Sequence, residues 1–199
     1  MINKQEYEMK KKEQILRAAS DLIKSEGFEG VTIRKIASLA NVNVALINYH
    51  FGSKNKLINE VILILVNSMR KSFVILDDDS VEPRERLKRF LLQYIDVYHQ
   101  YPFIIRRLLS QEEIIFEGQK EFVTFIKVIG LKKVQTTIEQ LTGETNSENL
   151  IIMMSHLLGA LFLPVLIEPM YEQVTGFALP DKEARIELFL KRYFPEIES

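Results

Sequence analysis

Cysteine is absent from this chain of 199 residues, and proline (six) and glycine (eight) are scarce. The first absence excludes disulfide scaffolds, thiolate zinc sites and cysteine nucleophiles. The scarcity of the two turn-forming residues disfavours a loop-rich all-β architecture. Residues 1–7 lack the apolar segment of a secretory signal. We therefore expect a protein of the reducing cytoplasm.

The composition that remains is that of a folded domain with an uneven charge. Hydrophobic residues make up 47% of the chain and aromatic residues 10%, enough to bury a core. Residues 1–56 hold ten Lys or Arg against six Asp or Glu, whereas residues 57–199 hold sixteen against twenty-one. A basic N-terminal quarter on an acidic remainder indicates that the two parts meet different partners.

Apolar residues recur at the helical period almost throughout, without β-type alternation of any length. The first apolar stripe covers residues 15–23 and ends near Gly27. Thr32 and Asn43 are placed to cap two short helices, and a long helix follows from Lys54 to Leu76. Further helices are predicted over 83–99, 102–117, 119–141, 148–167 and 181–194, with a loop beginning at Pro169 before the last. The sequence predicts an all-α fold.

The most apolar segment, residues 150–167, is close to the length that spans a membrane. However, His156 and Pro164 lie inside it, and the acidic Glu148 and Glu168 stand at its ends in place of a Lys/Arg cluster. A helix that is apolar all round is more simply a core helix or a dimer-interface helix. We expect no membrane association.

The two short helices, joined by a tight turn at Asn41-Val42, form a helix-turn-helix pattern. In such a unit the second helix enters the major groove of DNA and the first crosses the backbone. The residues expected to face the core are Ile33, Ile36, Ala37, Val42 and Ile47. Those expected to reach bases and phosphates are Asn48, Tyr49, His50 and Lys54. By spacing alone, a helical hairpin in any bundle fits the same pattern.

Four blocks of sequence narrow this choice: Ile15-Leu16-Arg17-Ala18-Ala19, Gly27-Phe28, residues 31–37 and residues 49–57. Over residues 9–60 they resemble the N-terminal domain of the TetR/AcrR family of bacterial transcriptional regulators. Beyond them, only length and helical pattern resemble that family's ligand-binding, dimerising body. The resemblance implies an N-terminal three-helix DNA-binding domain over 1–56 and a helical-bundle ligand-binding and dimerisation domain over 57–199.

The resemblance also implies roles for individual residues. Thr32 and Arg34 match positions that touch phosphates or base edges. Val44, Ala45 and Leu46, preceded by the capping Asn43, match the variable tip of the recognition helix. Tyr49 matches an aromatic residue that packs on a thymine methyl group or a sugar, and His50 and Lys54 match phosphate contacts. The set predicted to bind DNA is Thr32, Arg34, Asn43, Val44, Ala45, Leu46, Asn48, Tyr49, His50 and Lys54.

Two residues depart from the family's pattern. Asn48 stands where Tyr is common, and an asparagine amide can read adenine with two hydrogen bonds. Asn41 replaces the usual turn glycine, but asparagine tolerates a left-handed backbone. Because residues 44–46 are apolar, contact with thymine methyl groups is the chemistry left to them, and we expect an A·T-rich operator.

Catalytic and metal sites are not indicated by the sequence. Ser155 and His156 are adjacent, so they point to different faces of a helix. Glu112 and Glu113 could join His99 around a metal, but the spacing typical of such ligand sets does not occur. We predict that the protein is not an enzyme and needs no metal or cofactor.

Residues 83–170 contain aromatic and methionine side chains with a few polar groups, which suits a pocket for an apolar or amphipathic small molecule. The tentative ligand-binding residues are Tyr94, Tyr98, Arg106, Phe125, Met153 and His156. The same residues at helical spacing are equally typical of a core. His156 is the strongest single candidate, because a histidine in so apolar a helix needs a partner.

Together these features predict a homodimeric repressor that binds double-stranded operator DNA and is released by a small-molecule effector. The resemblance places the dimer interface in the helices near 148–170 and 181–194. Two alternatives remain: an adaptor whose helix-turn-helix is vestigial and binds only protein, and a helical hydrolase. The sequence does not name the effector, the operator or the regulated genes.

Overall fold

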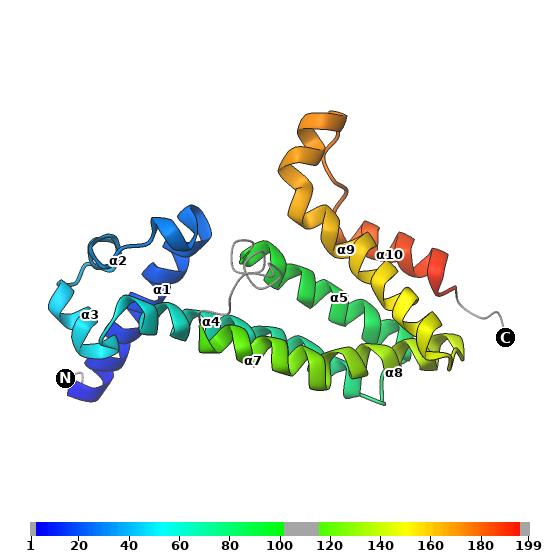
Figure 1. Cartoon of the computed structure of the whole chain (residues 1–199), viewed down its shortest axis with the longest axis horizontal. Coiled ribbons are helices and arrows are strands. Elements are labelled where there is room, and N and C mark those ends of the chain that lie inside the picture. Colours follow the sequence, from blue (N-terminus) through cyan, green and yellow to red (C-terminus); the bar gives the residue numbers. More distant parts are fainter. Residues whose placement is uncertain (1–2, 102–115, 196–199) are drawn as a thin grey trace. The chain divides into compact units, whose positions relative to one another are not determined.

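Every regular element in the described part of the chain is a helix. The computed structural model describes residues 3–101 and 116–195, and no strand occurs in them. The elements in chain order are α1 (Lys4–Gly30), α2 (Ile33–Leu39), α3 (Val44–Phe51), α4 (Lys54–Ser72), η1 (Phe73–Asp77), α5 (Pro83–Gln100), α7 (Glu117–Phe125), η2 (Ile126–Gly130), α8 (Leu131–Thr142), α9 (Ser147–Thr175) and α10 (Lys182–Tyr193) (Figure 1). The prediction of an all-α fold is confirmed.

The chain divides into two compact units. The described residues of the first unit are 3–67, 101 and 116–122, and those of the second are 68–100 and 123–195. Helices α4 and α7 each contribute residues to both units.

In the first unit, α1, α2 and α3 pack on one another. Their apolar faces and the start of α4 supply a core whose members include Ile15, Ile23, Ile36, Ile47 and Leu57, none more than 1% exposed. An ion pair between Lys12 Nζ and Glu60 Oε2, 2.9 Å apart, joins α1 to α4 at the rim of this core.

The first helix continues beyond the predicted end at Gly27. Gly27 instead forms a kink with φ 71° and ψ 180°, after which the chain turns again as far as Gly30. A positive φ of this size is readily adopted by glycine and costs other residues strain, so the glycine bends the element without ending it. Val31 then leads into α2 in an extended conformation.

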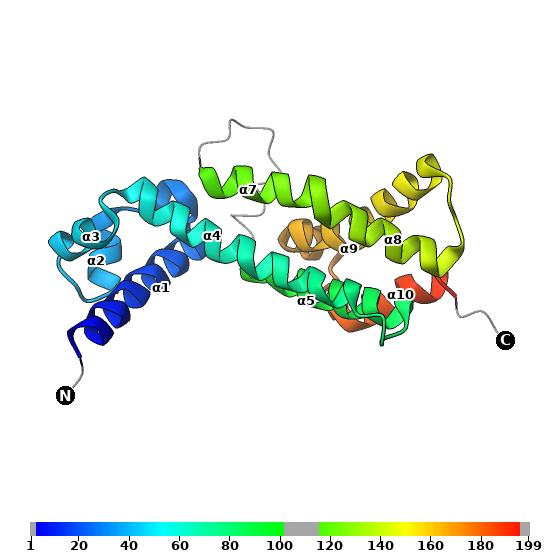
Figure 2. The same cartoon turned by 90° about the horizontal axis from the view of Figure 1, so that it is seen from below.

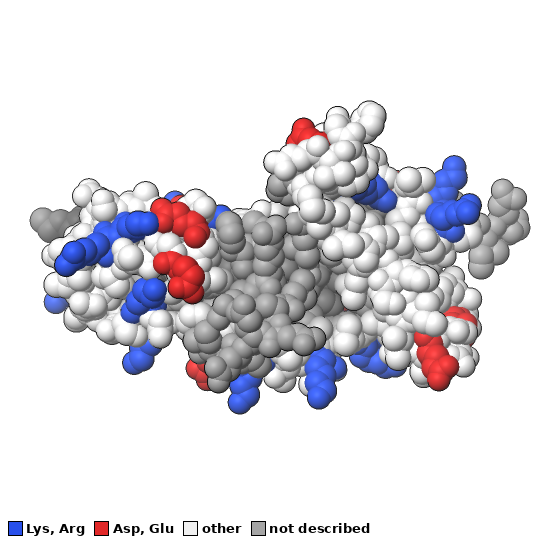
Figure 3. Space-filling model, turned by 45° about the horizontal axis from the view of Figure 1, so that its top comes forward, with Lys and Arg blue, Asp and Glu red and all other residues white. Residues whose placement is uncertain are grey.

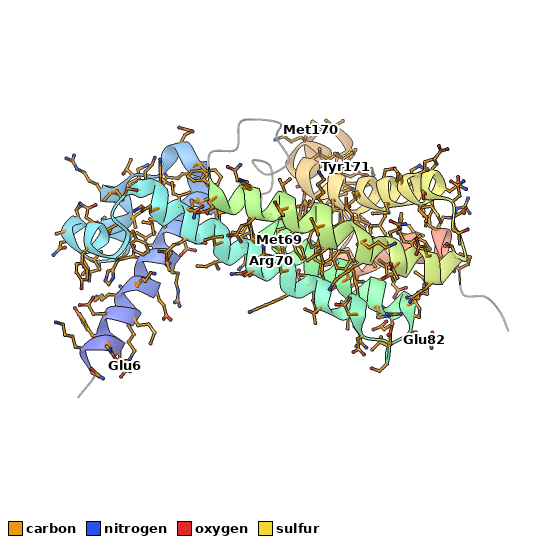
Figure 4. All side chains as sticks on the ribbon, turned by 60° about the horizontal axis from the view of Figure 1, so that its bottom comes forward. Glu6, Met69, Arg70, Glu82, Met170 and Tyr171 are labelled. Atoms are coloured by element: carbon orange, nitrogen blue, oxygen red, sulfur yellow. The ribbon has the colours of Figure 1, made fainter. Side chains whose placement is uncertain are left out.

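In the second unit, α5 is the central helix, in contact with η1, α8, α9 and α10. Figure 2 shows η2 and α8 following α7 in one continuous run, in which η2 is π-helical. A Cβ atom on Gly130 of η2 would meet the Phe73 ring at 3.1 Å, so a glycine allows this close approach. Arg70 of α4, labelled in Figure 4, lies over the Phe125 ring with its guanidinium carbon 5.4 Å from the ring centre.

A buried arginine ties three parts of the second unit together. Arg86 of α5 is only 4% exposed. Its Nη1 donates to the Leu76 carbonyl and to Asp79 Oδ1, both at 3.1 Å, and its Nη2 donates to Gln140 Oε1 at 2.7 Å. Charged hydrogen bonds of this kind compensate for taking the guanidinium out of water.

Several helix boundaries differ from those predicted. The helix starting at Lys54 ends at Ser72 and gives way to the 3-10 turn η1. The single helix expected over 119–141 is interrupted by the π-helical η2. Pro169 does not end α9, which runs on to Thr175 and stops at Gly176, where φ is 72°. The helix expected over 102–117 lies, except for its last residues, outside the described residues.

Helix α9 has one buried and one exposed apolar side. Leu150, Leu157 and Leu161 are each 1% exposed, whereas Ile151 is 66% and Leu163 53% exposed. Over Ser147–Val165 the helix is long and apolar enough to cross a membrane, with a mean hydropathy of 1.5, and 28% of that stretch is buried. A contiguous apolar face of this kind marks a contact with a protein or a membrane.

Candidate nucleic-acid interface

Helices α2 and α3 form a helix-turn-helix whose ends are fixed by side chains predicted from the sequence. Thr32 Oγ1 accepts a hydrogen bond from Lys35 N at 3.2 Å, and Asn43 Oδ1 accepts one from Leu46 N at 2.7 Å. Both residues are therefore N-caps that satisfy a free backbone N–H at a helix start. Between the helices, Asn41 has φ 47°, the left-handed conformation expected for it.

Three of the five residues predicted to face the core of this motif are buried. Ile36, Ala37 and Ile47 are buried, and Phe51 at the end of α3 is only 4% exposed. Ile33 and Val42 are half-buried and belong to the edge of the same core. This packing fixes which face of α3 is turned away from the protein.

The outward face of α3, with its N-cap, carries half of the side chains predicted to bind DNA. Tyr49 is 76% exposed and Val44 is 39% exposed. Asn43, Ala45 and Asn48 are also exposed, whereas Leu46 is half-buried. An amide, a phenol and small apolar groups on one helix face are the groups that hydrogen-bond base edges and contact thymine methyls.

Before α3, Thr32 and Arg34 lie at the start of α2 and are exposed. The neighbouring Lys35 is held by Glu26 Oε2 and by the Gly30 carbonyl, 3.0 Å away. Arg34 has no ion pair or hydrogen bond from its side chain within residues 3–101 and 116–195, so its guanidinium is available to a phosphate. In Figure 3, Lys and Arg side chains lie on the surface of the N-terminal helices together with acidic side chains.

His50 and Lys54 do not lie on the outward face, where the sequence predicted them. The His50 side chain is only 10% exposed and its Nε2 lies 3.3 Å from Glu8 Oε2 on α1. Lys54 Nζ donates to the Val31 carbonyl at 3.1 Å. Both side chains are directed to partners within the unit, His50 to Glu8 on α1 and Lys54 to the segment that joins α1 to α2. Their contact with phosphates stays a prediction.

Glu8 is a residue that sequence reasoning missed. It stands 42 positions before His50, and its part of α1 precedes the first buried residue, Ile15. Only the packing of α1 against α3 brings the carboxylate to the imidazole. No local pattern in the sequence signals this pair.

The structure brings together three of the six tentative ligand-binding residues. Tyr94, Tyr98 and Phe125 share a buried aromatic cluster with Phe73, Phe90 and Phe162. Burial raises the pKa of Tyr98 to about 12 and that of Tyr94 well above its usual 10.0. Each ring packs against neighbours 4.7 to 5.5 Å away, as in a core.

The other three do not join this cluster in the described structure. His156 is exposed on α9, with its ring 6.4 Å from that of Tyr193 on α10, and Met153 is half-buried. Arg106 lies outside the described residues. The polar partner expected for His156 is replaced by exposure, because the described residues do not cover this side of α9.

Comparison with known proteins places this geometry in a family. Residues 15–61 match the model of the bacterial regulatory proteins of the tetR family. That stretch contains α2, the turn, α3 and the capping residues described above. The helix-turn-helix domain of this chain belongs to the TetR family. Since the family consists of regulatory proteins, the chain is a DNA-binding regulator and not an enzyme.

Individual TetR-family relatives extend the likeness. Over 100 residues the chain is 31% identical to the transcriptional repressor NicS of Pseudomonas putida, an alignment that spans 50% of this chain and 47% of NicS. It is 25% identical over 196 residues to the probable transcriptional regulator YttP of Bacillus subtilis, covering 94% of this chain and 90% of YttP. The crystal structure of AibR, solved with isovaleryl coenzyme A and operator DNA, shares the fold with a TM-score of 0.67 at 17% identity, over 93% of this chain and 98% of AibR.

Proposed function

We propose that the protein is a homodimeric transcriptional repressor that binds operator DNA through α3 and is released by a small-molecule effector. Residues 1–56 are the DNA-binding domain and residues 57–199 the effector-binding and dimerisation domain. The observation that carries the proposal is the outward face of α3. Tyr49, Asn48 and Ala45 are exposed there, whereas Ile47 and Phe51 of the same helix are buried. A recognition helix has this arrangement, with one face packed on the protein and the other free to enter the major groove.

Repression supposes two recognition helices on one operator. A two-fold dimer places them about 34–36 Å apart, one turn of DNA. The surface that a second copy would cover is the exposed side of α9, with Ile151, Ile152, Leu158 and Leu163. Helix α10 also carries exposed apolar residues, including Leu188 at 71% exposure. In Figure 3 the surface over α9 is mostly free of charged side chains.

A second copy explains this face better than a membrane does. His156 and Pro164 lie within the apolar stretch, and the acidic Glu148 stands in the first turn of α9, after the N-cap Asn146. An obligate dimer buries on the order of 2,000 Å² of largely apolar surface. With this face covered, the protein would be soluble and act in the cytoplasm.

The effector is an apolar or amphipathic molecule bound beside Tyr94, Tyr98 and Phe125. A ligand there would part rings that now pack on one another, and η1 and α5 would have to move with them. Since α4 contributes residues to both units, movement at its C-terminal end offers a route by which the ligand changes the spacing of the recognition helices. AibR, which has the same fold, was solved in complex with both isovaleryl coenzyme A and operator DNA, so one fold can hold a small molecule and an operator together.

The test is an electrophoretic mobility shift with the DNA that flanks the protein's own gene. The proposal expects a complex of two chains per duplex, resistant to an excess of unrelated DNA, and its release by a fraction of cellular metabolites. Failure to prefer any flanking duplex over unrelated DNA would favour the alternative of an adaptor that binds protein only. If no metabolite fraction releases the protein from the DNA, the part of the proposal that concerns a small-molecule effector is wrong.

A further inference from the structure

The second unit contains a cleft that does not include the aromatic cluster. Its volume is about 360 Å³, within the range of small-molecule sites. It lies where the C-terminal end of α5, with Asp96 and His99, meets Glu168 of α9 and the first turn of α10. Leu179 and Pro180 of the connecting loop supply an apolar part of its wall.

Two of the cleft's charged groups, Lys182 and Asp96, neutralise each other, and a third, Asp181, caps a helix. Lys182 Nζ donates a hydrogen bond to Asp96 Oδ1 and lies 3.8 Å from Glu183 Oε1. Asp181 Oδ1 accepts a hydrogen bond from Ala184 N at 2.8 Å and caps α10. These contacts order the rim of the cleft, and none of them involves Arg185 or Glu168.

Arg185 is the exception in this network. Its Nε and Nη1 atoms are shielded from water and have no hydrogen-bond partner among residues 3–101 and 116–195. Glu168, which lines the same cleft and is half-buried, forms no ion pair or hydrogen bond from its side chain within the described residues. A guanidinium removed from water without an acceptor is unfavourable, and a carboxylate that accepts a hydrogen bond from it lowers that penalty.

The net charge of the side chains that line the cleft limits which ligands with a carboxylate group can bind. Four acidic side chains, Asp96, Glu168, Asp181 and Glu183, face only two cations, Lys182 and Arg185. A simple anion would be repelled by this excess of negative charge. A ligand that also carries a positive charge would instead be attracted, because its cation would meet the unpaired Glu168.

We propose that this cleft binds a small zwitterion of the amino acid type, with its carboxylate on Arg185 and its ammonium group at Glu168. Leu179 and Pro180 would contact a short side chain. The site is separate from the aromatic residues proposed for the effector, and direct binding measurements test it without reference to DNA. Failure of this proposal and failure of the proposed function are therefore distinguishable.

The experiment is isothermal titration calorimetry of the full chain with the standard L-amino acids, one at a time, and with acetate and ethylamine as half-ligands. We expect at least one amino acid to bind and both half-ligands to bind far more weakly. Arg185→Gln should weaken binding about 30-fold or more, the loss typical of breaking a buried charged pair. Glu168→Gln should also weaken it, without the loss of secondary structure that a failure to fold would give.

Arg192→Gln is the matched control, because Arg192 is an exposed arginine of the same helix outside the cleft. It should leave binding unchanged. The proposal is overturned if no amino acid binds the wild-type chain at millimolar concentration, if acetate binds as tightly as the best amino acid, or if Arg185→Gln has no more effect than Arg192→Gln. If the Arg185→Gln variant sediments as a monomer, the proposal is also overturned, because Arg185 would then belong to the interface between two copies of the chain.

Discussion

Replacing Ile47 by alanine tests the orientation of α3 on which the interface depends. Ile47 is 1% exposed and lies in the core that α1, α2 and α3 share. Truncating a buried isoleucine to alanine costs about 2–5 kcal/mol, from lost transfer free energy and from the cavity left behind. At about 2–4 °C per kcal/mol for a chain of this size, the melting temperature should fall by roughly 4–20 °C.

The matched variant is Tyr49→Ala, two residues along the same helix. Tyr49 is 76% exposed, so its loss should change stability by no more than about 0.5 kcal/mol. Thermal melts followed by circular dichroism, at one fixed protein concentration because dimers gain stability with concentration, measure both values. Ile47→Val, which removes one methylene, should lie between them at about 0.5–1.5 kcal/mol. A stable Ile47→Ala protein beside an unstable Tyr49→Ala protein would mean that α3 is rotated relative to this description.

Three further changes have defined outcomes. Arg34→Ala should reduce the slope of log K against log salt by about 0.9, as loss of one phosphate contact does, and an unchanged slope would remove Arg34 from the backbone contacts. Leu163 on α9 is 53% exposed, and its replacement by aspartate should convert the dimer to a monomer in sedimentation. The control Glu172→Gln, a polar change on the same helix, should leave the dimer intact. A monomeric wild-type protein would contradict the proposed interface. Burial raises the pKa of Tyr98 from 10.0 to about 12, so the contribution of neutral Tyr98 to the free energy of unfolding, roughly 2–3 kcal/mol, is fully present below pH 10 and is lost as the pH rises through 12. The Tyr98→Phe variant should not show this part of the loss of stability at alkaline pH. Identical stability–pH profiles of the variant and the wild type would contradict this prediction.

The local features of the fold follow from residue type and spacing. Thr32 and Asn43 are the N-caps that the sequence predicts, and Asn41 adopts the left-handed conformation expected of a turn asparagine. The apolar stripe of α4, from Leu57 to Met69, is buried as its period predicts. These features depend on neighbours within a few positions, and the sequence contains that information directly.

The features that sequence reasoning missed depend on contacts between distant segments. Glu8 on α1 lies beside His50 on α3. Arg86 binds one residue that precedes it in the chain, Leu76, and one that follows it, Gln140. Helix α9 continues past Pro169 to Thr175, although the local rule for proline predicts that the helix ends there. His156 was expected to have a partner because its helix is apolar, but the apolar side on which it lies is the exposed one.

The central claim is that this chain recognises DNA through the outward face of α3. The most direct test is fluorescence anisotropy of a labelled duplex from beside the protein's own gene, titrated with wild-type protein and with Tyr49→Ala at one salt concentration. The account predicts that wild-type protein binds this duplex at least about 10³-fold more tightly than a shuffled duplex, and that Tyr49→Ala loses most of that preference while remaining folded. Equal affinity for the two duplexes, or a Tyr49→Ala protein that keeps the full preference, would contradict it.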